Sequence, residues 1–268
     1  MAEGGHHPYL RHPEWHADDT ARPIAFAHRG GTDHAPENTV AAFDHAWRQG
    51  YRYLETDVHP SADGVLMAFH DPDLQRTVGQ PVGIGDLTAQ ELAALDVDGH
   101  AIPTMAELFE RFPDAHFNID AKSDASIEPL TTMVRERDLI DRVCLASFSQ
   151  RRIDTMRSHL GPQLMTNLGA SAITQLRIGG RTRRRGHQAA QVPARQGPVP
   201  VADRSFLRSA SRSGIAVHVW TINDRPEMER LLDLGVDGIM TDETALLRDV
   251  FTERGLWPAG AGERSVRA

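Results

Sequence analysis

The chain has 268 residues, of which 40% are hydrophobic and 25% are charged, as in an ordinary globular protein. This length fits one large α/β domain or two small ones. The net charge of -8 and the isoelectric point near 5.9 exclude a nucleic-acid-binding protein that relies on a basic surface. The single cysteine, Cys144, excludes an intramolecular disulfide and gives no sign of an oxidising compartment.

Two terminal segments differ in composition from the rest of the chain. Residues 1–22 contain four histidines among acidic and small residues, and they lack the basic start, apolar stretch and cleavage site of a signal peptide. Residues 255–268 are rich in glycine and alanine. We predict that both segments are flexible tails and that residues 23–254 form the folded domain. Because no apolar run approaches the roughly 20 residues that cross a bilayer, we expect no membrane span and a cytoplasmic location.

Short β-rich runs alternate with amphipathic helical patterns between these tails. The predicted strands are 24–28, 51–57, 116–121, 143–148, 163–168, 188–192, 215–222 and 238–241. The clearest predicted helices are 40–49, 105–112, 127–137, 151–160 and 226–234. Because eight strands alternate with helices over about 250 residues, the pattern predicts a (β/α)8 TIM barrel rather than an open sheet.

One further strand pattern, at 65–70, breaks this alternation. It follows the strand at 51–57 too closely for a parallel crossover, which needs about a dozen residues. Asp63-Gly64 is instead a hairpin-turn signal. We therefore predict an antiparallel return that brings His70 to the mouth of the barrel. Residues of about 71–103 then form a small insertion after strand two, which walls one side of the site.

Three carboxylates fall at the ends of predicted strands. Glu55 and Asp57 share one face of the second strand, and Asp120 ends the third strand, so all three converge at the barrel mouth. Carboxylates held side by side are costly to bury unless a cation or a proton compensates them. Ligands that are all oxygen favour Mg²⁺, Ca²⁺ or Mn²⁺ over zinc, so this set predicts a site for a hard divalent cation.

Histidines and basic side chains accompany these carboxylates. His28 and Arg29 end the first strand, His70 ends the predicted hairpin, and Lys122 shares the face of Asp120. Histidine moves protons near neutral pH, and the two basic side chains with a cation suit a phosphate. Singly, such residues are more often surface or core features. Their joint occurrence at three strand ends favours a site for metal-assisted phosphoryl or acyl hydrolysis.

These residues resemble the motifs of a known family. The matching segments are His28-Arg29-Gly30, Pro36-Glu37-Asn38-Thr39, Glu55-x-Asp57, Asp63-Gly64, His70-Asp71, Asn118-x-Asp120-x-Lys122, Trp220-Thr221-Ile222-Asn223 and Asp237-Gly238-Ile239-Met240-Thr241-Asp242. In this order, from about residue 24 to 247, the sequence resembles the glycerophosphodiester phosphodiesterases. The resemblance implies a barrel with a small insertion, one divalent cation, and hydrolysis of a small-molecule glycerophosphodiester to sn-glycerol 3-phosphate and an alcohol.

The resemblance also implies a role for each residue. His28 and His70 would be the general acid/base pair. Metal ligation would fall to Glu55, Asp57 and Asp120, and phosphate binding to Arg29 and Lys122. Asp120 stands where many members of the family have glutamate, and this shorter side chain leaves Ca²⁺ and Mg²⁺ both open.

Further residues have supporting interpretations. Trp220, at the end of a predicted strand, offers an apolar wall to the glycerol carbons, although a core tryptophan fits nearly as well. Glu37 is predicted to orient Arg29. Asn38, Asn223 and Asp242 read as helix caps. The only basic cluster, within 177–185, is predicted to be a solvated loop at the barrel bottom, away from the site.

Two other functions remain open at this stage. A lysophospholipase D-like phosphodiesterase acting on lipids requires an apolar rim or a membrane anchor, and neither is evident in the sequence. A non-catalytic barrel that binds a phosphoester would be favoured by loss of His28, His70 or a carboxylate, and all of these are present.

Overall fold

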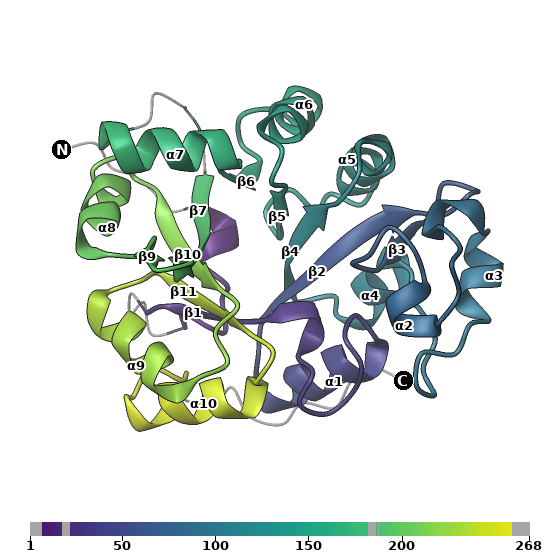
Figure 1. Cartoon of the computed structure of the whole chain (residues 1–268), viewed down its shortest axis with the longest axis horizontal. Helices are drawn as coiled ribbons and strands as arrows, with labels where there is room; N and C mark the ends of the chain where they lie inside the picture. The colour runs from purple at the N-terminus through teal and green to yellow at the C-terminus, as the bar shows by residue number, and fades with distance from the viewer. Residues whose placement is uncertain (1–6, 18–21, 182–185, 187, 259–268) are drawn as a thin grey trace.

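The computed structural model describes residues 7–17, 22–181, 186 and 188–258, and its centre is a closed barrel (Figure 1). Around the ring the parallel strands follow the order β1, β11, β10, β7, β6, β5, β4 and β2, and β2 pairs with β1 to close it. Their bounds are Ile24–Ala27 (β1), Tyr53–Pro60 (β2), His116–Ala121 (β4), Val143–Ala146 (β5), Met165–Asn167 (β6), Gln188–Pro193 (β7), Ala216–Trp220 (β10) and Gly238–Thr241 (β11). The predicted (β/α)8 barrel is confirmed.

Helices surround this barrel in the described part of the chain (Figure 1). Their bounds are Val40–Gln49 (α1), Met105–Arg111 (α4), Ile127–Glu136 (α5), Gln150–Leu160 (α6), Ala170–Gly179 (α7), Arg204–Ser211 (α8), Arg225–Leu234 (α9) and Thr244–Glu253 (α10).

Sequence signals set the ends of α1. Thr39 accepts a hydrogen bond from the Ala42 N–H, and Gly50 ends the helix with a positive φ of 103°. The interpretation of Asn38 as the cap is therefore wrong by one residue.

The predicted antiparallel return is confirmed. The short strand β3, Leu66–Ala68, pairs antiparallel with the end of β2, and Gly64 takes the positive φ of 81° that a tight turn requires. The insertion that follows contains the short helices α2, Gln75–Val78, and α3, Ala89–Ala93. It has a small apolar core separate from that of the barrel. This core comprises Met67, Phe69, Leu74, Ile84, Leu92, Val97 and Ile102.

The N-terminal segment differs from the prediction. Residues 7–17 are ordered against the barrel bottom, where Tyr9 and Trp15 are fully buried among the core aromatic residues. The His12 and His116 rings lie tilted against each other with centroids 4.6 Å apart, and each ring donates a hydrogen bond to a backbone carbonyl. The prediction of a flexible tail is therefore wrong for 7–17, because aromatic side chains in this segment close the bottom of the barrel. The other residues of that tail, except Arg22, lie outside the described residues.

The remaining expectations concern the C-terminus and the basic loop. Residues 255–258 follow α10, and Trp257 packs edge-on against Trp15 with ring centroids 4.9 Å apart. The rest of the predicted C-terminal tail, and residues 182–185 of the basic cluster, lie outside the described residues. Arg177 of that cluster forms an ion pair with Asp203. Across the described ranges, no helix is long and apolar enough to cross a membrane.

Candidate active site

A cavity of about 620 Å³ opens at the carboxyl ends of the barrel strands. Its lining includes all but one of the predicted site residues, namely His28, Arg29, Glu55, Asp57, His70, Asp120, Lys122 and Trp220. The exception, Glu37, lies behind Arg29 and accepts a hydrogen bond of 3.0 Å from the guanidinium. The barrel mouth therefore gathers the side chains that the sequence pattern assigned to it.

The carboxylates come together through the register of two strands. Asp57 of β2 is the direct neighbour of Asp120 of β4, and Glu55 lies two residues earlier on the same face as Asp57. All three are buried, with exposed fractions of 5% for Glu55, 1% for Asp57 and 8% for Asp120. The Lys122 ammonium lies 2.7 Å from a carboxylate oxygen of each aspartate. Arg29 Nε lies 3.0 Å from the other oxygen of Asp57. Basic side chains thus compensate the buried negative charge.

Burial and charge act in opposite directions on these groups. Burial and the neighbouring Asp57 raise the pKa of Glu55 to about 7. Burial likewise raises the pKa of Asp120. Burial acts on Asp57 in the same sense, but the charges of Lys122 and Arg29 outweigh it and lower the pKa. The pKa values of the three carboxylates are therefore shifted in different directions, as is common in catalytic clefts.

The carboxylate set fits a divalent cation by its chemistry. Every donor is an oxygen, and Asp120 Oδ1 is buried without a hydrogen-bond partner among the described residues. In the same part of the chain, no three His, Cys, Asp or Glu side chains are placed to hold a metal ion as they stand. Instead, the Lys122 ammonium lies between the two aspartates. A cation would therefore bind here only with movement of that side chain.

A carboxylate holds the first histidine. His28 Nδ1 lies 2.6 Å from Asp242 Oδ1, and its Nε2 lies 3.8 Å from Glu55 Oε2. Asp242 is fixed in turn by Asn223, whose amide donates to Oδ2 at 2.8 Å and accepts from the Asp242 N–H at 2.9 Å. Burial alone would lower the pKa of His28, but the Glu55 and Asp242 carboxylates outweigh it and raise the pKa. One ring nitrogen is thus held while the other is directed towards the carboxylates.

The second histidine is held in the same way. His70 Nδ1 lies 2.6 Å from Asp71 Oδ1. Arg76 of α2 donates to Asp71 at 2.5 Å and to Glu37 Oε1 at 2.6 Å. Because Glu37 also accepts from Arg29, an unbroken series of hydrogen bonds through Asp71 and Arg76 of the insertion joins His70 to Arg29 at the barrel mouth. The insertion is therefore part of the site rather than a distant wall.

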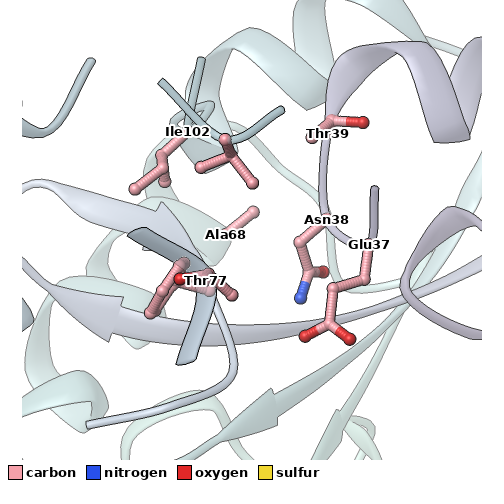
Figure 2. Close-up of a pocket in the computed structure, with 8 residues that line it drawn as sticks. Glu37, Asn38, Thr39, Ala68, Thr77 and Ile102 are labelled. Atoms are coloured by element: carbon pink, nitrogen blue, oxygen red, sulfur yellow. The ribbon is translucent and has the colours of Figure 1, made fainter. Parts of the chain in front are cut away.

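The loop before α1 lies directly against this insertion. Figure 2 shows Glu37, Asn38 and Thr39 on one side of a small cavity of about 10 Å³, and Thr77 and Ile102 of the insertion on the other. The contact holds Glu37 next to the insertion.

The backbone at Arg29 has an unusual conformation. β1 ends at Ala27, so His28 and Arg29 lie in a short 3-10 turn, His28–Gly30, rather than in the strand as predicted. Arg29 has a positive φ of 52°, which is uncommon for a residue with a side chain. This turn directs the Arg29 N–H to Glu55 Oε2 at 3.0 Å, while the side chain reaches Asp57. Strain at a functional site is a common pattern.

The opposite side of the cavity is uncharged and mixes apolar with polar side chains. Trp220 ends β10 and packs edge-on against Phe148, with ring centroids 5.7 Å apart. Phe148 follows β5, is 62% exposed, and lies 5.9 Å from Lys122 Nζ. Trp220 therefore belongs to the cavity wall, as predicted, and Phe148 is a lining residue that the sequence did not single out.

Several site residues escaped the sequence interpretation. Asp242 and Asn223 do not act as helix caps, because Glu243 precedes α10 without a capping side chain and Asp224 caps α9. They position His28 instead. The available signal was the end of a barrel strand, where Asp242 follows β11, since such positions reach the mouth of a barrel. Arg76 lies on a helix of the insertion and not at the end of a barrel strand, so its position in the sequence did not indicate that it reaches the site.

The barrel and the charged cavity at its mouth define a TIM-barrel enzyme. The sequence model of the glycerophosphoryl diester phosphodiesterase family matches residues 28–246. A protein of Mycobacterium tuberculosis named probable glycerophosphodiester phosphodiesterase 2 is 36% identical over 244 residues, which are 87% of this chain and 92% of that protein. The chain therefore belongs to the glycerophosphoryl diester phosphodiesterase family.

Solved structures share the fold. A glycerophosphodiester phosphodiesterase from Thermotoga maritima has a TM-score of 0.69 and 28% identity, covering 86% of this chain and 99% of that chain. An Oleispira antarctica phosphodiesterase, solved in complex with its product sn-glycerol-3-phosphate, has a TM-score of 0.69 and 23% identity, covering 86% of this chain and 97% of that chain. The second likeness supports the fold alone.

Proposed function

We propose that the protein hydrolyses glycerophosphodiesters to sn-glycerol 3-phosphate and an alcohol. The observation that carries this proposal is the pair of histidines at one charged cavity, each held at Nδ1 by a carboxylate. The family to which the chain belongs and the names of its relatives support the substrate class.

The two histidines would divide the proton transfers. Because Asp242 and Asp71 hold Nδ1 of His28 and His70, the Nε2 atoms are the ones free to act. One Nε2 would take the proton of the attacking hydroxyl or water as the new P–O bond forms. The other would give its proton to the leaving oxygen as the P–O bond to the alcohol breaks. Arg29 and Lys122 would bind the phosphate oxygens and stabilise the charge that develops on them.

We further propose that Glu55, Asp57 and Asp120 hold one divalent cation, Ca²⁺ or Mg²⁺. Their burial, their all-oxygen donor set and the buried Asp120 Oδ1, which has no hydrogen-bond partner among the described residues, support this assignment. When bound, such a cation would polarise the phosphoryl oxygen and make the nucleophile more acidic. Lys122 would then turn from the aspartates towards the phosphate. Thermal unfolding with and without added Ca²⁺ or Mg²⁺ tests this binding, because an ion that prefers the folded state raises Tm.

Substitution of the histidines tests the acid–base assignment. We expect His28→Ala and His70→Ala each to lower kcat for glycerophosphocholine by about 10²- to 10⁴-fold, the usual contribution of a positioned acid or base. His100→Ala, a change in the insertion away from the cavity lining, is the matched control. Wild-type turnover in both site variants would overturn the proposed mechanism.

The cytoplasmic location stays a prediction, which fractionation of the native cells would test.

A further inference from the structure

A second, much smaller cavity lies between the loop before α1 and the insertion (Figure 2). Its volume of about 10 Å³ is at the lower end of the roughly 10–15 Å³ that one buried water molecule needs. Among the described residues, it shares none of its lining with the large cavity at the barrel mouth. It is therefore a separate site, at the junction of two elements that both contribute to the catalytic groups.

Two polar atoms in the walls of this cavity need a partner. Asn38 Nδ2 and Thr77 Oγ1 are both buried, and neither has a hydrogen-bond partner among the described residues. Asn38 comes from the loop and is 3% exposed, whereas Thr77 comes from α2 of the insertion, on the other side of the cavity (Figure 2). Buried polar groups without a partner are uncommon in native proteins, because their lost hydration is not replaced.

The chemistry of the two atoms selects water as the partner. An amide NH2 group only donates hydrogen bonds, whereas a hydroxyl group both donates and accepts them. One water molecule can accept from Asn38 Nδ2 and donate to Thr77 Oγ1. A cation does not fit against an NH2 donor, an anion does not fit beside Glu37, which also lines the cavity, and a larger molecule exceeds the volume.

We infer that one ordered water molecule occupies this cavity and joins Asn38 Nδ2 to Thr77 Oγ1, so that a buried hydrogen-bonded bridge holds the insertion against the barrel mouth. Both ends of the bridge are fixed within their own elements. The Asn38 N–H donates to the Arg29 carbonyl at 2.7 Å, and Asn38 Oδ1 accepts from the Thr56 hydroxyl at 2.8 Å. Thr77 is part of the helix α2.

The bridge lies next to the contacts that orient the second histidine. Thr77 directly follows Arg76, and Arg76 donates to Asp71, which holds His70 Nδ1. The Arg76 side chain is 51% exposed, so water competes for its link to Glu37, whereas the bridge is buried. The bridge therefore helps to fix His70 relative to the barrel mouth. Only this kinetic consequence rests on the proposed function.

A high-resolution crystal structure of the wild-type protein tests the site itself. We expect one water molecule within hydrogen-bond distance of both Asn38 Nδ2 and Thr77 Oγ1. A dry cavity, or a water molecule that contacts only one of the two atoms, would overturn the inference.

Two substitutions at one position test what the bridge does. Thr77→Val keeps the shape of the side chain and removes the hydroxyl, whereas Thr77→Ser keeps the hydroxyl. In Thr77→Val we expect lower hydrogen-exchange protection of α2, and a kcat for glycerophosphocholine that is about two- to ten-fold lower, the loss that corresponds to one neutral hydrogen bond. KM should not change, because Thr77 does not line the large cavity. Thr77→Ser should retain both wild-type values.

Thr252→Val is the matched control. Thr252 is exposed on α10, and its hydroxyl donates to the Arg248 carbonyl of the same helix. We expect this variant to leave the exchange of α2 and kcat unchanged. Equal protection of α2 in Thr77→Val and Thr77→Ser would overturn the inference. If the wild-type protein hydrolyses no glycerophosphocholine, the proposed function fails, and the crystal structure and hydrogen exchange still decide the inference.

Discussion

The contact between Asp242 and His28 Nδ1 allows a quantitative prediction. Asp242→Ala removes a charged hydrogen-bond partner at 2.6 Å from His28 Nδ1, and it also removes the acceptor of the Asn223 side-chain NH2 group. A hydrogen bond to a charged group contributes about 1.5–3 kcal/mol. If this bond holds the imidazole in its reactive orientation, its loss should lower kcat by about 10- to 150-fold. KM should change less, because Asp242 does not line the cavity.

The pH dependence gives this prediction a second readout. The carboxylates of Glu55 and Asp242 outweigh burial and raise the pKa of His28, so removal of one of them should lower that pKa. The limb of the kcat profile that reports His28 should therefore move to lower pH in Asp242→Ala. A purely structural effect would lower kcat without moving the limb.

A conservative change at the same position is informative. In Asp242→Asn, one orientation of the amide would place its NH2 group against the NH2 group of Asn223, and the other would place it against His28 Nδ1. Neither restores the native bonds, so we expect the asparagine variant to be as impaired as the alanine variant. Asp233→Asn, which breaks an exposed ion pair with Arg254, is the control. A raised KM with unchanged kcat in the Asp242 variants would refute the reasoning.

Three further predictions concern the barrel bottom and the charged groups of the site. Burial lowers the pKa of His12 from 6.5 to about 4, so the folded state should lose about 3 kcal/mol of stability from this group as the pH falls from above 6.5 to below 4. His12→Gln should flatten that decline in denaturant unfolding. Arg76→Ala removes the hydrogen bond that holds Asp71, so we expect kcat to fall about ten-fold, and an unchanged kcat would contradict this expectation. Because the Arg76 side chain is half exposed, stability should change by at most about 1 kcal/mol. Lys122→Met leaves buried Asp120 without its cationic partner and leaves Asp57 with Arg29 alone, which should lower stability by about 3–5 kcal/mol. Added Ca²⁺ or Mg²⁺ should restore part of the lost Tm, and no recovery would count against the cation site.

The barrel and most of its site were predictable because they depend on periodic patterns. Glu55 and Asp57 share a strand face by period two, and the short link before β3 allows only an antiparallel return. These features place His70 and the carboxylates at one end of the barrel. Such rules act over a few residues, so a single sequence is enough to apply them.

The parts that were missed depend on contacts between distant segments. Asp242 reaches His28 across the β1–β11 pair, and Arg76 reaches Glu37 from the insertion, so neither contact leaves a local pattern. The N-terminal segment packs for the same reason. Trp15 and Tyr9 are apolar side chains in an otherwise polar stretch, and only the shape of the barrel bottom provides their partners.

The most direct test of the proposed metal-dependent hydrolysis uses glycerophosphocholine as substrate. Its conversion is followed by phosphorus NMR with metal-free protein, before and after addition of Ca²⁺ or Mg²⁺. We expect no turnover until the cation is added, and then a single new resonance from sn-glycerol 3-phosphate. Release of phosphocholine in its place, or full turnover by the metal-free protein, would contradict it.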